Sequence, residues 1–453
     1  MNYENKKVLV VGMARSGVAV AKLLRAHGAL VTINDSKGEE ALGEALDALR
    51  GLELEWQLGC PAEPLLEGKD VLVISPGISI DAPFVQKAKA MGLYVTGELE
   101  VAWQLSQGHL VAVTGTNGKT TTVSLLGEIF QNAGKVTHVV GNIGYPYSLA
   151  ALESKPEDVF VCEVSSFQME TADTFHPHVA LLTNITEDHL NRHGTMAVYT
   201  EMKMRMFQRQ TPEDWAVFNA DDPGLKGLSR QVKSHVLKFS RKKEVREGAF
   251  VREGEIILRI GGEEKTVCRA EEVRIPGPHN LENALGAICC AAVMEVPVPV
   301  IRHSLRTFKG VEHRIESTRV LDGVEYFNDS KGTNVDSTIK AVETMTRPTA
   351  LILGGYDKKV SFDPLSREII AHQDTIREIV LIGETAPQIE ASLRKAGYTH
   401  LRHASSLGEA VEKCREIAQP GWNVLLSPAC ASFDMFKDYE ERGRVFKKIV
   451  SEL

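Results

Sequence analysis

The sequence predicts an α/β protein of three consecutive domains. The chain has 453 residues, a length that fits roughly three domains of ordinary size. Short apolar runs alternate with stretches that have the period of an amphipathic helix, and the runs end in glycine or small polar residues. We expect a Rossmann-like first domain (1–97), a central P-loop ATPase-like domain with a parallel sheet (98–310) and a Rossmann-like third domain (311–453).

The composition excludes several classes of protein. The chain is 43% hydrophobic and 25% charged, as a soluble globular protein is, and its formal net charge of −8 argues against a nucleic-acid surface. Seven cysteines without C-x-x-C spacing fit reduced thiols in the cytosol. The chain enters a strand at once, so we expect no signal peptide, and Glu295, Pro297 and Pro299 interrupt the most apolar stretch (284–301), so we expect no membrane span. A cytoplasmic protein with small-molecule partners is therefore expected.

The first domain opens with "KKVLVVGMARSGVAVAKLLRAHGALVTINDS", which reads as strand, glycine turn, helix and second strand. Gly12 and Gly17 match the dinucleotide-binding fingerprint, but Ala14 replaces the middle glycine, so a plain structural turn remains an alternative. The pattern of strand and turn recurs in "DVLVISPGI". Because ligands collect at the carboxyl ends of parallel strands, we expect a ribose or base near Asp35, Ser36, Ser75 and Gly77.

The central domain carries "LVAVTGTNGKTTTVSLL", which resembles a phosphate loop. The strict pattern G-x-x-x-x-G-K-[ST] fails, because Val113 stands at its first position and Gly115 is only three residues before Gly118. Strand, glycine turn and helix nevertheless follow in order, so backbone N–H groups and the helix dipole would face an anion. Lys119 would add a charge and Thr120 a hydroxyl for magnesium, whereas the alternative is an ordinary turn between strand and helix.

Three further stretches carry polar residues that could complete this site. "DVFVCEVSSFQME" places Glu163 at the end of a strand, and "VALLTNITEDHLNRHG" places Asp188 and His189 after another. These side chains suit magnesium, although the metal prefers oxygen ligands, and His189 could instead cap a helix or lie on the surface. "IPGPHNLENALGAICCAAV" places His279, Asn280 and Asn283 at the start of an apolar helix, where asparagine amides can cap the helix or read an adenine edge.

The stretch "AVYTEMKMRMF" allows two interpretations. From spacing alone, Met202 and Met206 form the buried stripe of a helix, and Lys203 and Arg205 are solvated. A family resemblance described below implies a functional role for Lys203 instead.

Three strands of the third domain end in polar turns. A surface loop explains any one of them, but three turns at the same kind of position suggest one ligand-facing rim. The turns contain Asp329, Ser330, Lys331, Thr333 and Asn334, then Lys358 and Lys359, then Ser427 and Ser432.

A nucleotide-sized site, a phosphate loop and a cationic rim together indicate phosphoryl transfer with a second substrate. No Ser-His-Asp arrangement is evident, so catalysis would rest on positioning and electrostatics. The chain as a whole resembles the Mur ligases, the ATP-dependent amide-bond formers of peptidoglycan precursor synthesis. The resemblance covers nearly the full length and is carried by "TGTNGKTTT", "CEVSSFQME", "TNITEDHLNRHG", "HNLENALGA", "EHRIE" and "NDSKGTNVDST".

The resemblance implies a particular reaction. The Rossmann-like first domain, "NDSKGTN" and "LSPACASFDMFKDYEERG" are similar to the branch of the family that adds D-glutamate to UDP-N-acetylmuramoyl-L-alanine. The carboxylate of that precursor would attack the γ-phosphate of ATP, and the amine of D-glutamate would attack the resulting acyl phosphate, releasing ADP and phosphate. Two Mg²⁺ ions, a monomeric protein and a hinge near residues 308–311 are also expected.

The resemblance assigns roles to individual residues. The implied catalytic residues are Lys119, His189 and Lys203, with Lys203 carbamylated, which requires a neutral amine and hence a lowered pKa. The implied metal ligands are Thr120, Glu163, His189 and the Lys203 carbamate. ATP is expected at Gly115, Thr116, Asn117, Gly118, Lys119, Thr120, Thr121, Asn280, Asn283, His313, Arg314, Asp329 and Lys331. The UDP-sugar is expected at Ser16, Asp35, Ser36, Ser75, Gly77, Asn142 and His189. D-Glutamate is expected at Thr333, Lys358, Ser432, Phe433 and Tyr439, where Tyr439 replaces an expected phenylalanine.

Two other functions remain open. One is a Mur-type ligase with another amino-acid substrate, since one substitution in a pocket can change specificity. The other is a non-catalytic nucleotide-sensing module. A sensor needs neither metal ligands nor a second-substrate rim, so Glu163, His189, Lys331 and Lys358 favour an enzyme.

Overall fold

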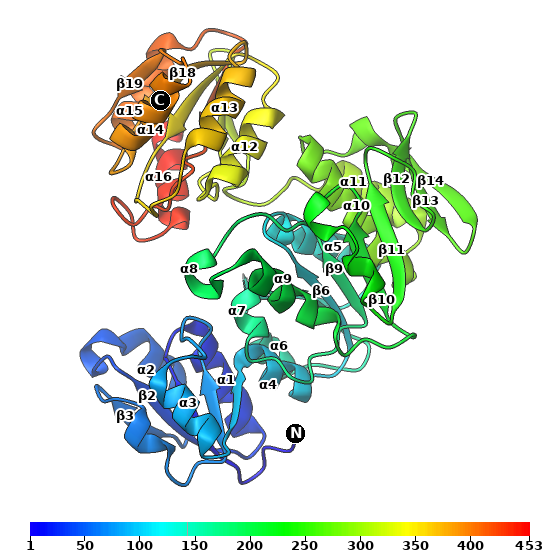
Figure 1. Cartoon of the computed structure of the whole chain (residues 1–453), viewed down its shortest axis with the longest axis vertical. Coiled ribbons are helices and arrows are strands. Elements are labelled where there is room, and N and C mark those ends of the chain that lie inside the picture. Colours follow the sequence, from blue (N-terminus) through cyan, green and yellow to red (C-terminus); the bar gives the residue numbers. More distant parts are fainter. Residues whose placement is uncertain (143) are drawn as a thin grey trace. The chain divides into compact units, whose positions relative to one another are not determined.

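Three β-sheets follow one another along the chain in the computed structural model, which describes residues 1–142 and 144–453 (Figure 1). The chain divides into two compact units: Met1–Val273 with Glu282–Phe308, and Arg274–Leu281 with Lys309–Leu453. The first unit holds two sheets and the second unit holds the third. The predicted α/β class is confirmed, and the border between Phe308 and Lys309 lies in the stretch for which the sequence predicts a hinge.

The first sheet is fully parallel, with the order β3-β2-β1-β4-β5. Its strands are β1 (Lys7–Val11), β2 (Leu30–Asp35), β3 (Glu55–Leu58), β4 (Val71–Ile74) and β5 (Tyr94–Gly97). Its helices are α1 (Arg15–Ala26), α2 (Gly43–Leu49) and α3 (Pro83–Ala90). Alternate residues of β1 face opposite sides, because Val8 and Val10 join one apolar cluster with α1 and α2, and Leu9 and Val11 join another with α3. The strand order reverses between β1 and β4, so the turns after these strands lie at a switch point where ligands bind in such sheets.

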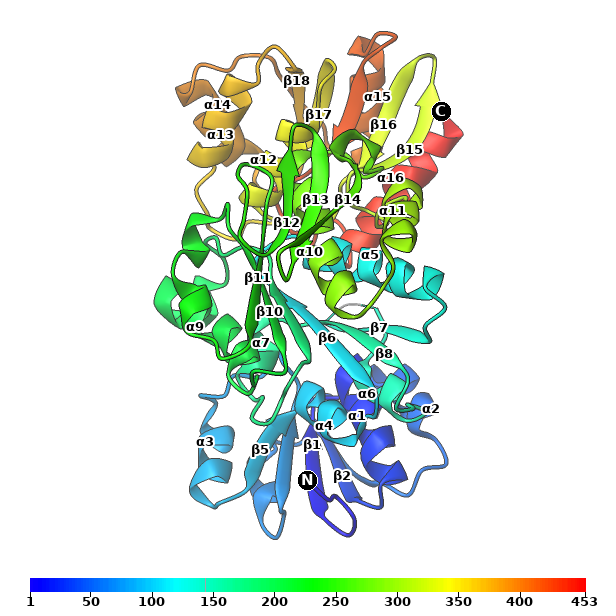
Figure 2. The same ribbon diagram turned by 90° about the vertical axis from the view of Figure 1, so that its right-hand side faces the viewer.

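The central sheet has the order β14-β13-β12-β11-β10-β9-β6-β8-β7 (Figure 2). Its strands are β6 (His109–Thr114), β7 (Thr137–Gly141), β8 (Val159–Glu163), β9 (Val179–Leu182), β10 (Trp215–Asn219), β11 (His235–Ser240), β12 (Gly248–Arg252), β13 (Glu255–Ile260) and β14 (Glu263–Arg269). The predicted parallel sheet is present from β7 to β12, and β13 and β14 extend it as antiparallel strands. Glu253–Gly254 and Gly261–Gly262 make the two turns, with φ of 53°, 81°, 62° and 80°, as two-residue hairpin turns of type I′ require.

The central part of the chain also contains α-helices. They are α4 (Glu98–Leu105), α5 (Lys119–Asn132), α6 (Tyr147–Ala151), α7 (Ser166–Met169), α8 (Leu190–His193), α9 (Met196–Met204), α10 (Pro278–Val293) and α11 (Val298–Thr307). One apolar cluster runs from α1 through α4 and α6 to Ala112 and Phe160 of the central sheet. This continuous core explains why the first two sheets form one unit.

The third sheet has the order β15-β16-β20-β17-β18-β19, and only the β15–β16 pair is antiparallel. Its elements are β15 (Glu316–Leu321), β16 (Val324–Asn328), α12 (Val335–Thr344), β17 (Thr349–Leu353), α13 (Asp363–Ala371), β18 (Ile376–Leu381), α14 (Ala386–Lys395), β19 (Leu401–His403), α15 (Leu407–Ile417), β20 (Asn423–Leu426) and α16 (Tyr439–Glu452). Leu351 and Leu353 pack with α12, α13 and α14, whereas Ala350 and Ile352 pack with α15 and α16. The turns after β16, β17 and β20 therefore lie at neighbouring carboxyl ends.

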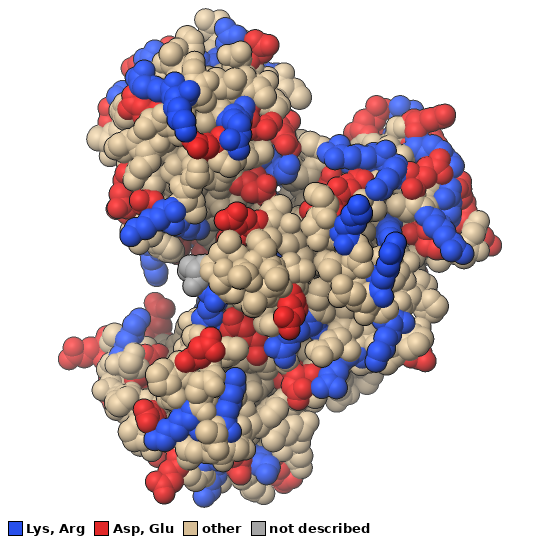
Figure 3. Space-filling view, in the orientation of Figure 1, with Lys and Arg blue, Asp and Glu red and all other residues tan. Residues whose placement is uncertain are grey.

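Acidic and basic side chains alternate over the face drawn in Figure 3. Cys60 is half-buried and the six other cysteines are buried, and all seven are free thiols. Within residues 1–142 and 144–453, no helix combines the length and the apolarity needed to cross a bilayer. The apolar stretch near Ala284 is part of α10, as predicted, and much of it is buried.

Candidate active site

The loop after β6 has a conformation that requires both of its glycines. Gly115 and Gly118 have φ of 146° and 84°, which other residues rarely adopt. A Cβ atom on Gly115 would lie 1.9 Å from Thr183 Oγ1, and one on Gly118 would lie 2.2 Å from Asn283 Oδ1. Helix α5 begins directly afterwards at Lys119, so the positive end of its dipole lies at this loop. N–H groups and a helix dipole in this arrangement favour an anion at the loop.

Two lysines converge on the loop. Lys119 Nζ donates to the carbonyl oxygens of Gly115 (2.9 Å) and Thr116 (2.7 Å), and Lys203 Nζ donates to the same Gly115 oxygen (2.7 Å). The side chain of Lys203 is buried, and burial together with the nearby Lys119 holds its pKa well below its ordinary value. The prediction from spacing that Lys203 is solvated is therefore wrong, because α9 directs this side chain past the Tyr199 ring (4.5 Å) to the loop.

A hydroxyl and a carboxylate meet at the start of α5. Thr120 Oγ1 donates to Glu163 Oε2 (2.9 Å), and Asn142 Nδ2 donates to Glu163 Oε1 (2.9 Å). Thr120 and Glu163 are buried, and Thr121 Oγ1 is a buried atom without a hydrogen-bond partner in the part of the chain that the structure describes. Buried oxygen atoms beside an anion-binding loop are the donors that magnesium prefers, so these residues fit the ion.

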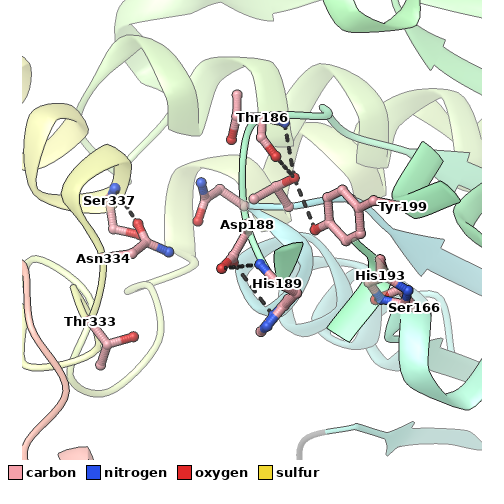
Figure 4. A network of polar contacts seen from close by, with 12 residues as sticks. Ser166, Thr186, Asp188, His189, His193, Tyr199, Thr333, Asn334 and Ser337 are labelled. Carbon is pink, nitrogen blue, oxygen red and sulfur yellow. Dashed lines mark hydrogen bonds and ion pairs between the residues drawn. The ribbon is translucent and has the colours of Figure 1, made fainter. Parts of the chain in front are cut away.

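Tyr199 connects α9 to this loop, and His189 precedes α8 beside Asp188 (Figure 4). The His189 backbone N–H donates to Asp188 Oδ1 (2.9 Å), and the imidazole Nε2 lies 3.5 Å from Asp188 Oδ2. The Tyr199 hydroxyl lies 3.2 Å from Thr116 Oγ1. Tyr199 did not follow from the sequence, although its position four residues before Lys203 puts both on one face of a helix.

Asn184 is a second residue that sequence reasoning missed. Its Oδ1 accepts from the backbone N–H of Asn117 (2.8 Å), and its Nδ2 donates to the Asn117 carbonyl (3.0 Å). Thr183 Oγ1 donates to the same carbonyl (2.6 Å). The polar run "TNIT" directly after an apolar strand was the available signal.

The turns after β1, β2 and β4 meet in the first sheet. Asp35 Oδ2 accepts from the backbone N–H of Met13 (2.8 Å), so this carboxylate also closes the first turn. A Cβ on Gly12 would lie 2.5 Å from Ser75 Oγ, and one on Gly17 would lie 1.8 Å from the Gly12 oxygen. The other predicted sugar-site residues of these turns are half-buried Ser16 and exposed Ser36 and Gly77. The structure thus brings the predicted residues of this sheet to one edge.

In the second unit, the turns after β16 and β20 are joined through Asp329. Its Oδ2 accepts from Ser427 Oγ (2.7 Å), its Oδ1 accepts from the Ile315 N–H (3.2 Å), and burial raises the pKa of its carboxyl group to about 6. Lys358 Nζ, after β17, donates to the Thr333 carbonyl (3.2 Å). The three polar turns therefore form one rim, as predicted.

Other predicted residues lie along this rim. Lys331 Nζ is 5.3 Å from the centroid of the Tyr439 ring, Ser432 is buried, and Phe433 is exposed with its ring 6.1 Å from that of Tyr356. Asn334 caps α12 by accepting from the Ser337 N–H (2.8 Å; Figure 4).

Arg442, which the sequence did not indicate, holds two turns of the rim together through hydrogen bonds. It is fully buried on α16 and donates to Ser330 Oγ (2.9 Å), the Ser330 carbonyl (2.8 Å) and the Cys430 carbonyl (3.1 Å). Its guanidinium group thereby fixes the turns after β16 and β20 relative to each other.

The remaining predicted ATP residues lie in both units. His313 has φ of 64°, and its Nδ1 is 2.9 Å from Asn328 Nδ2. Arg314 is half-buried and follows directly in the chain. Asn280 Nδ2 donates to the Pro276 carbonyl (2.6 Å) within the second unit, whereas Asn283 lies beside Gly118 in the first unit.

Comparison with known families gives three matches in chain order. A model described as "Mur ligase MurD-like, N-terminal domain" matches residues 6–97, one described as "Mur ligase middle domain" matches 113–291, and one described as "Mur ligase, glutamate ligase domain" matches 313–430.

Similar proteins match along the whole chain. Proteins named "UDP-N-acetylmuramoylalanine--D-glutamate ligase" from Caldanaerobacter subterraneus subsp. tengcongensis and Clostridioides difficile are 48% and 45% identical over 455 residues, covering all of both chains. The solved UDP-N-acetylmuramate-alanine ligase MurC from Thermotoga maritima is similar with a TM-score of 0.60 and 19% identity, covering 98% of this chain and 99% of that one. MurF from Acinetobacter baumannii gives 0.63 and 16%, covering 100% and 91%. These two structures support the fold alone.

Proposed function

The chain belongs to the Mur ligase family, and from this premise we propose that it is the ATP-dependent ligase that joins D-glutamate to UDP-N-acetylmuramoyl-L-alanine. Full-length similarity to relatives of that name carries this proposal. The chemistry is supported by a glycine loop that holds Lys119 and a buried Lys203 beside the Thr120–Glu163 pair. The product would enter peptidoglycan precursor synthesis.

The phosphate loop would bind ATP through the N–H groups at the start of α5 and through Lys119. Lys119 now donates to two loop carbonyls, and it would exchange these bonds for oxygens of the γ-phosphate. A carboxylate oxygen of the precursor attacks the γ-phosphorus, and the bond from that phosphorus to the ADP oxygen breaks. The amine of D-glutamate then attacks the acyl carbon, loses a proton and displaces phosphate.

Magnesium, when bound, offsets the repulsion between the carboxylate and the triphosphate. Thr120 and Glu163 would hold one ion, and His189 with carbamylated Lys203 would hold a second; the number of two ions is part of the proposal. The carbamate forms when a neutral Nζ attacks carbon dioxide and loses a proton. Burial of Lys203 supports this step, because it lowers the pKa and so increases the neutral fraction of the amine.

The substrate sites follow the three sheets. The UDP-sugar would bind at the switch point of the first sheet, through Ser16, Asp35, Ser36, Ser75 and Gly77, with Asn142 and His189 from the central part of the chain. ATP would bind along residues 115–121 and at Asn280, Asn283, His313, Arg314, Asp329 and Lys331. D-Glutamate would bind at Thr333, Lys358, Ser432, Phe433 and Tyr439.

We place the domain boundaries at 1–97, 98–310 and 311–453 and the reaction in the cytoplasm. We also propose a monomer, since one chain supplies all of these residues.

Phosphate release from ATP tests the proposal. Purified protein is assayed with magnesium and UDP-N-acetylmuramoyl-L-alanine against a panel of amino acids that includes both glutamate enantiomers. Release that depends on D-glutamate is the expected result. Release with another amino acid would support a ligase with a different amino-acid substrate. No release with any amino acid would favour a nucleotide-sensing module.

A further inference from the structure

Arg192 on α8 links the central sheet to the turn after β4. Its Nη2 donates to the carbonyl oxygen of Ile78 (2.8 Å), in the turn that the proposed function assigns to the UDP-sugar. The same turn is closed by a bond from the Ile78 N–H to the Ser75 oxygen (2.9 Å), and Ser75 Oγ contacts the Val11 oxygen (3.3 Å). The guanidinium group therefore binds the last residue of the hydrogen-bonded turn from Ser75 to Ile78.

Glu170 orients this arginine. Arg192 Nε donates to Glu170 Oε1 (3.1 Å), and Nη2 donates to Glu170 Oε2, so the pair is bidentate. The side chains of Glu170 and Arg192 are only 6% and 18% exposed, and the guanidinium carbon lies 5.3 Å from the Phe167 ring. Such a pair is more rigid than a surface ion pair.

The pair also lies close to His189. The Arg192 N–H donates to the carbonyl of His189 (3.0 Å), the residue that precedes α8, so the first turn of this helix joins both residues. The His189 ring lies 4.8 Å from the Phe167 ring, which also contacts Arg192. A displacement of the turn after β4 would therefore reach His189 through few intervening groups.

We propose that the Arg192–Glu170 pair is a positioning device that fixes the UDP-sugar turn of the first sheet relative to His189. The inference rests on the proposed function. Arg192 contacts a backbone carbonyl and acts through it, so the pair sets the affinity for the sugar nucleotide and the alignment of its carboxylate.

Arg209 provides a matched control. It also donates to a carbonyl and a carboxylate in the same segment, the Asp173 oxygen (2.8 Å) and Asp173 Oδ1 (2.9 Å). Among the described residues, however, no bond from Arg209 to the first sheet is found. This pair is more exposed than the Arg192–Glu170 pair, with side chains 53% and 56% exposed, so R209Q controls for the loss of an arginine charge in this part of the chain without touching the turn.

The experiment compares R192Q, R192K, E170Q and R209Q in steady-state kinetics and in calorimetric binding of UDP-N-acetylmuramoyl-L-alanine. R192Q should raise the KM and the Kd for this precursor about tenfold, the change that about 1.4 kcal/mol produces. The KM values for ATP and D-glutamate should stay within about twofold. R192K keeps the charge but loses the two-nitrogen contact with Glu170, and E170Q loses the orienting carboxylate. The KM and Kd of both variants for the precursor should therefore lie between those of wild type and R192Q. R209Q should match wild type.

Each result bears on one conclusion. If R192Q raises all three KM values equally, or binds the precursor as R209Q does, the positioning role is wrong. If R192Q folds poorly, the KM values of R192K and E170Q test the proposal instead. An increase for the precursor alone supports the positioning role, and an equal increase for all three substrates contradicts it. If wild type neither binds the precursor nor releases phosphate, the proposed function itself fails and the inference fails with it.

Discussion

Asp329→Asn should stabilise the ligand-free second unit while it removes a group from the proposed ATP site. The carboxylate of Asp329 is buried and accepts from Ser427 Oγ (2.7 Å) and the Ile315 N–H (3.2 Å). Asparagine has the same shape without the charge. Its oxygen can keep the bond to Ile315, and its amide can donate to Ser427, whose hydroxyl can turn to Thr338 Oγ1 at 3.0 Å.

The expected magnitude comes from the pKa of this group. Burial raises it from 3.8 to about 6, so the folded chain binds the proton more tightly than the unfolded chain. Stability therefore falls as the pH rises from about 4 to about 6. At 1.36 kcal/mol per pKa unit, ionised Asp329 costs about 3 kcal/mol at neutral pH. Below about pH 4 the group is protonated in both states, and this cost is absent.

Hydrogen exchange of the amides in β16 and β20 measures this difference locally. At neutral pH the variant should be more protected than wild type by up to about 3 kcal/mol, and the gap should shrink as the pH approaches about 4. Equal or weaker protection of the variant at neutral pH would refute the reasoning. Phosphate release should fall in the same variant, since stability and activity oppose each other at such sites.

Three further changes test other parts of the site. Glu163→Gln should raise the magnesium concentration for half-maximal phosphate release at least about tenfold, because an amide is a weaker ligand than a carboxylate; a titration unchanged from that of the exposed-site control Glu157→Gln would contradict this. Lys203→Ala should abolish D-glutamate-dependent phosphate release, and added acetate or formate should restore part of it by replacing the carbamate; activity without any rescue agent would exclude the carbamate. Arg442→Met should destabilise the second unit by about 3 kcal/mol, because it leaves the buried carbonyls of Ser330 and Cys430 unpaired; an unchanged unfolding temperature would refute this.

The predictions from sequence that succeeded depend on short-range residue patterns. Strands such as 110–114 and turns such as Gly115–Gly118 are specified by short-range patterns, so the order of strands, turns and helices followed from the chain alone. Lys203 shows the limit of periodicity. Its spacing on a helix is that of a solvated residue, but the helix packs so that this side chain is buried against the glycine loop after β6.

Asn184, Arg192 and Arg442 depend on contacts between residues far apart in the chain. Arg192 meets the Ile78 carbonyl, and Arg442 meets the Ser330 and Cys430 carbonyls. A sequence pattern shows residue types but not which backbone carbonyl a side chain reaches, so the partners of these two arginines could not be predicted.

The sequence by itself determined the α/β class, the glycine turns between strands and helices, and the family motifs that point to a ligase, since all three depend on residue type and short spacing. Only the tertiary structure decided the antiparallel extension of the central sheet, the burial that lowers the pKa of Lys203 and raises that of Asp329, and the arginines that join separate turns. Desolvation and long-range hydrogen bonds arise when distant segments pack together, and neither is a property of a single stretch of chain.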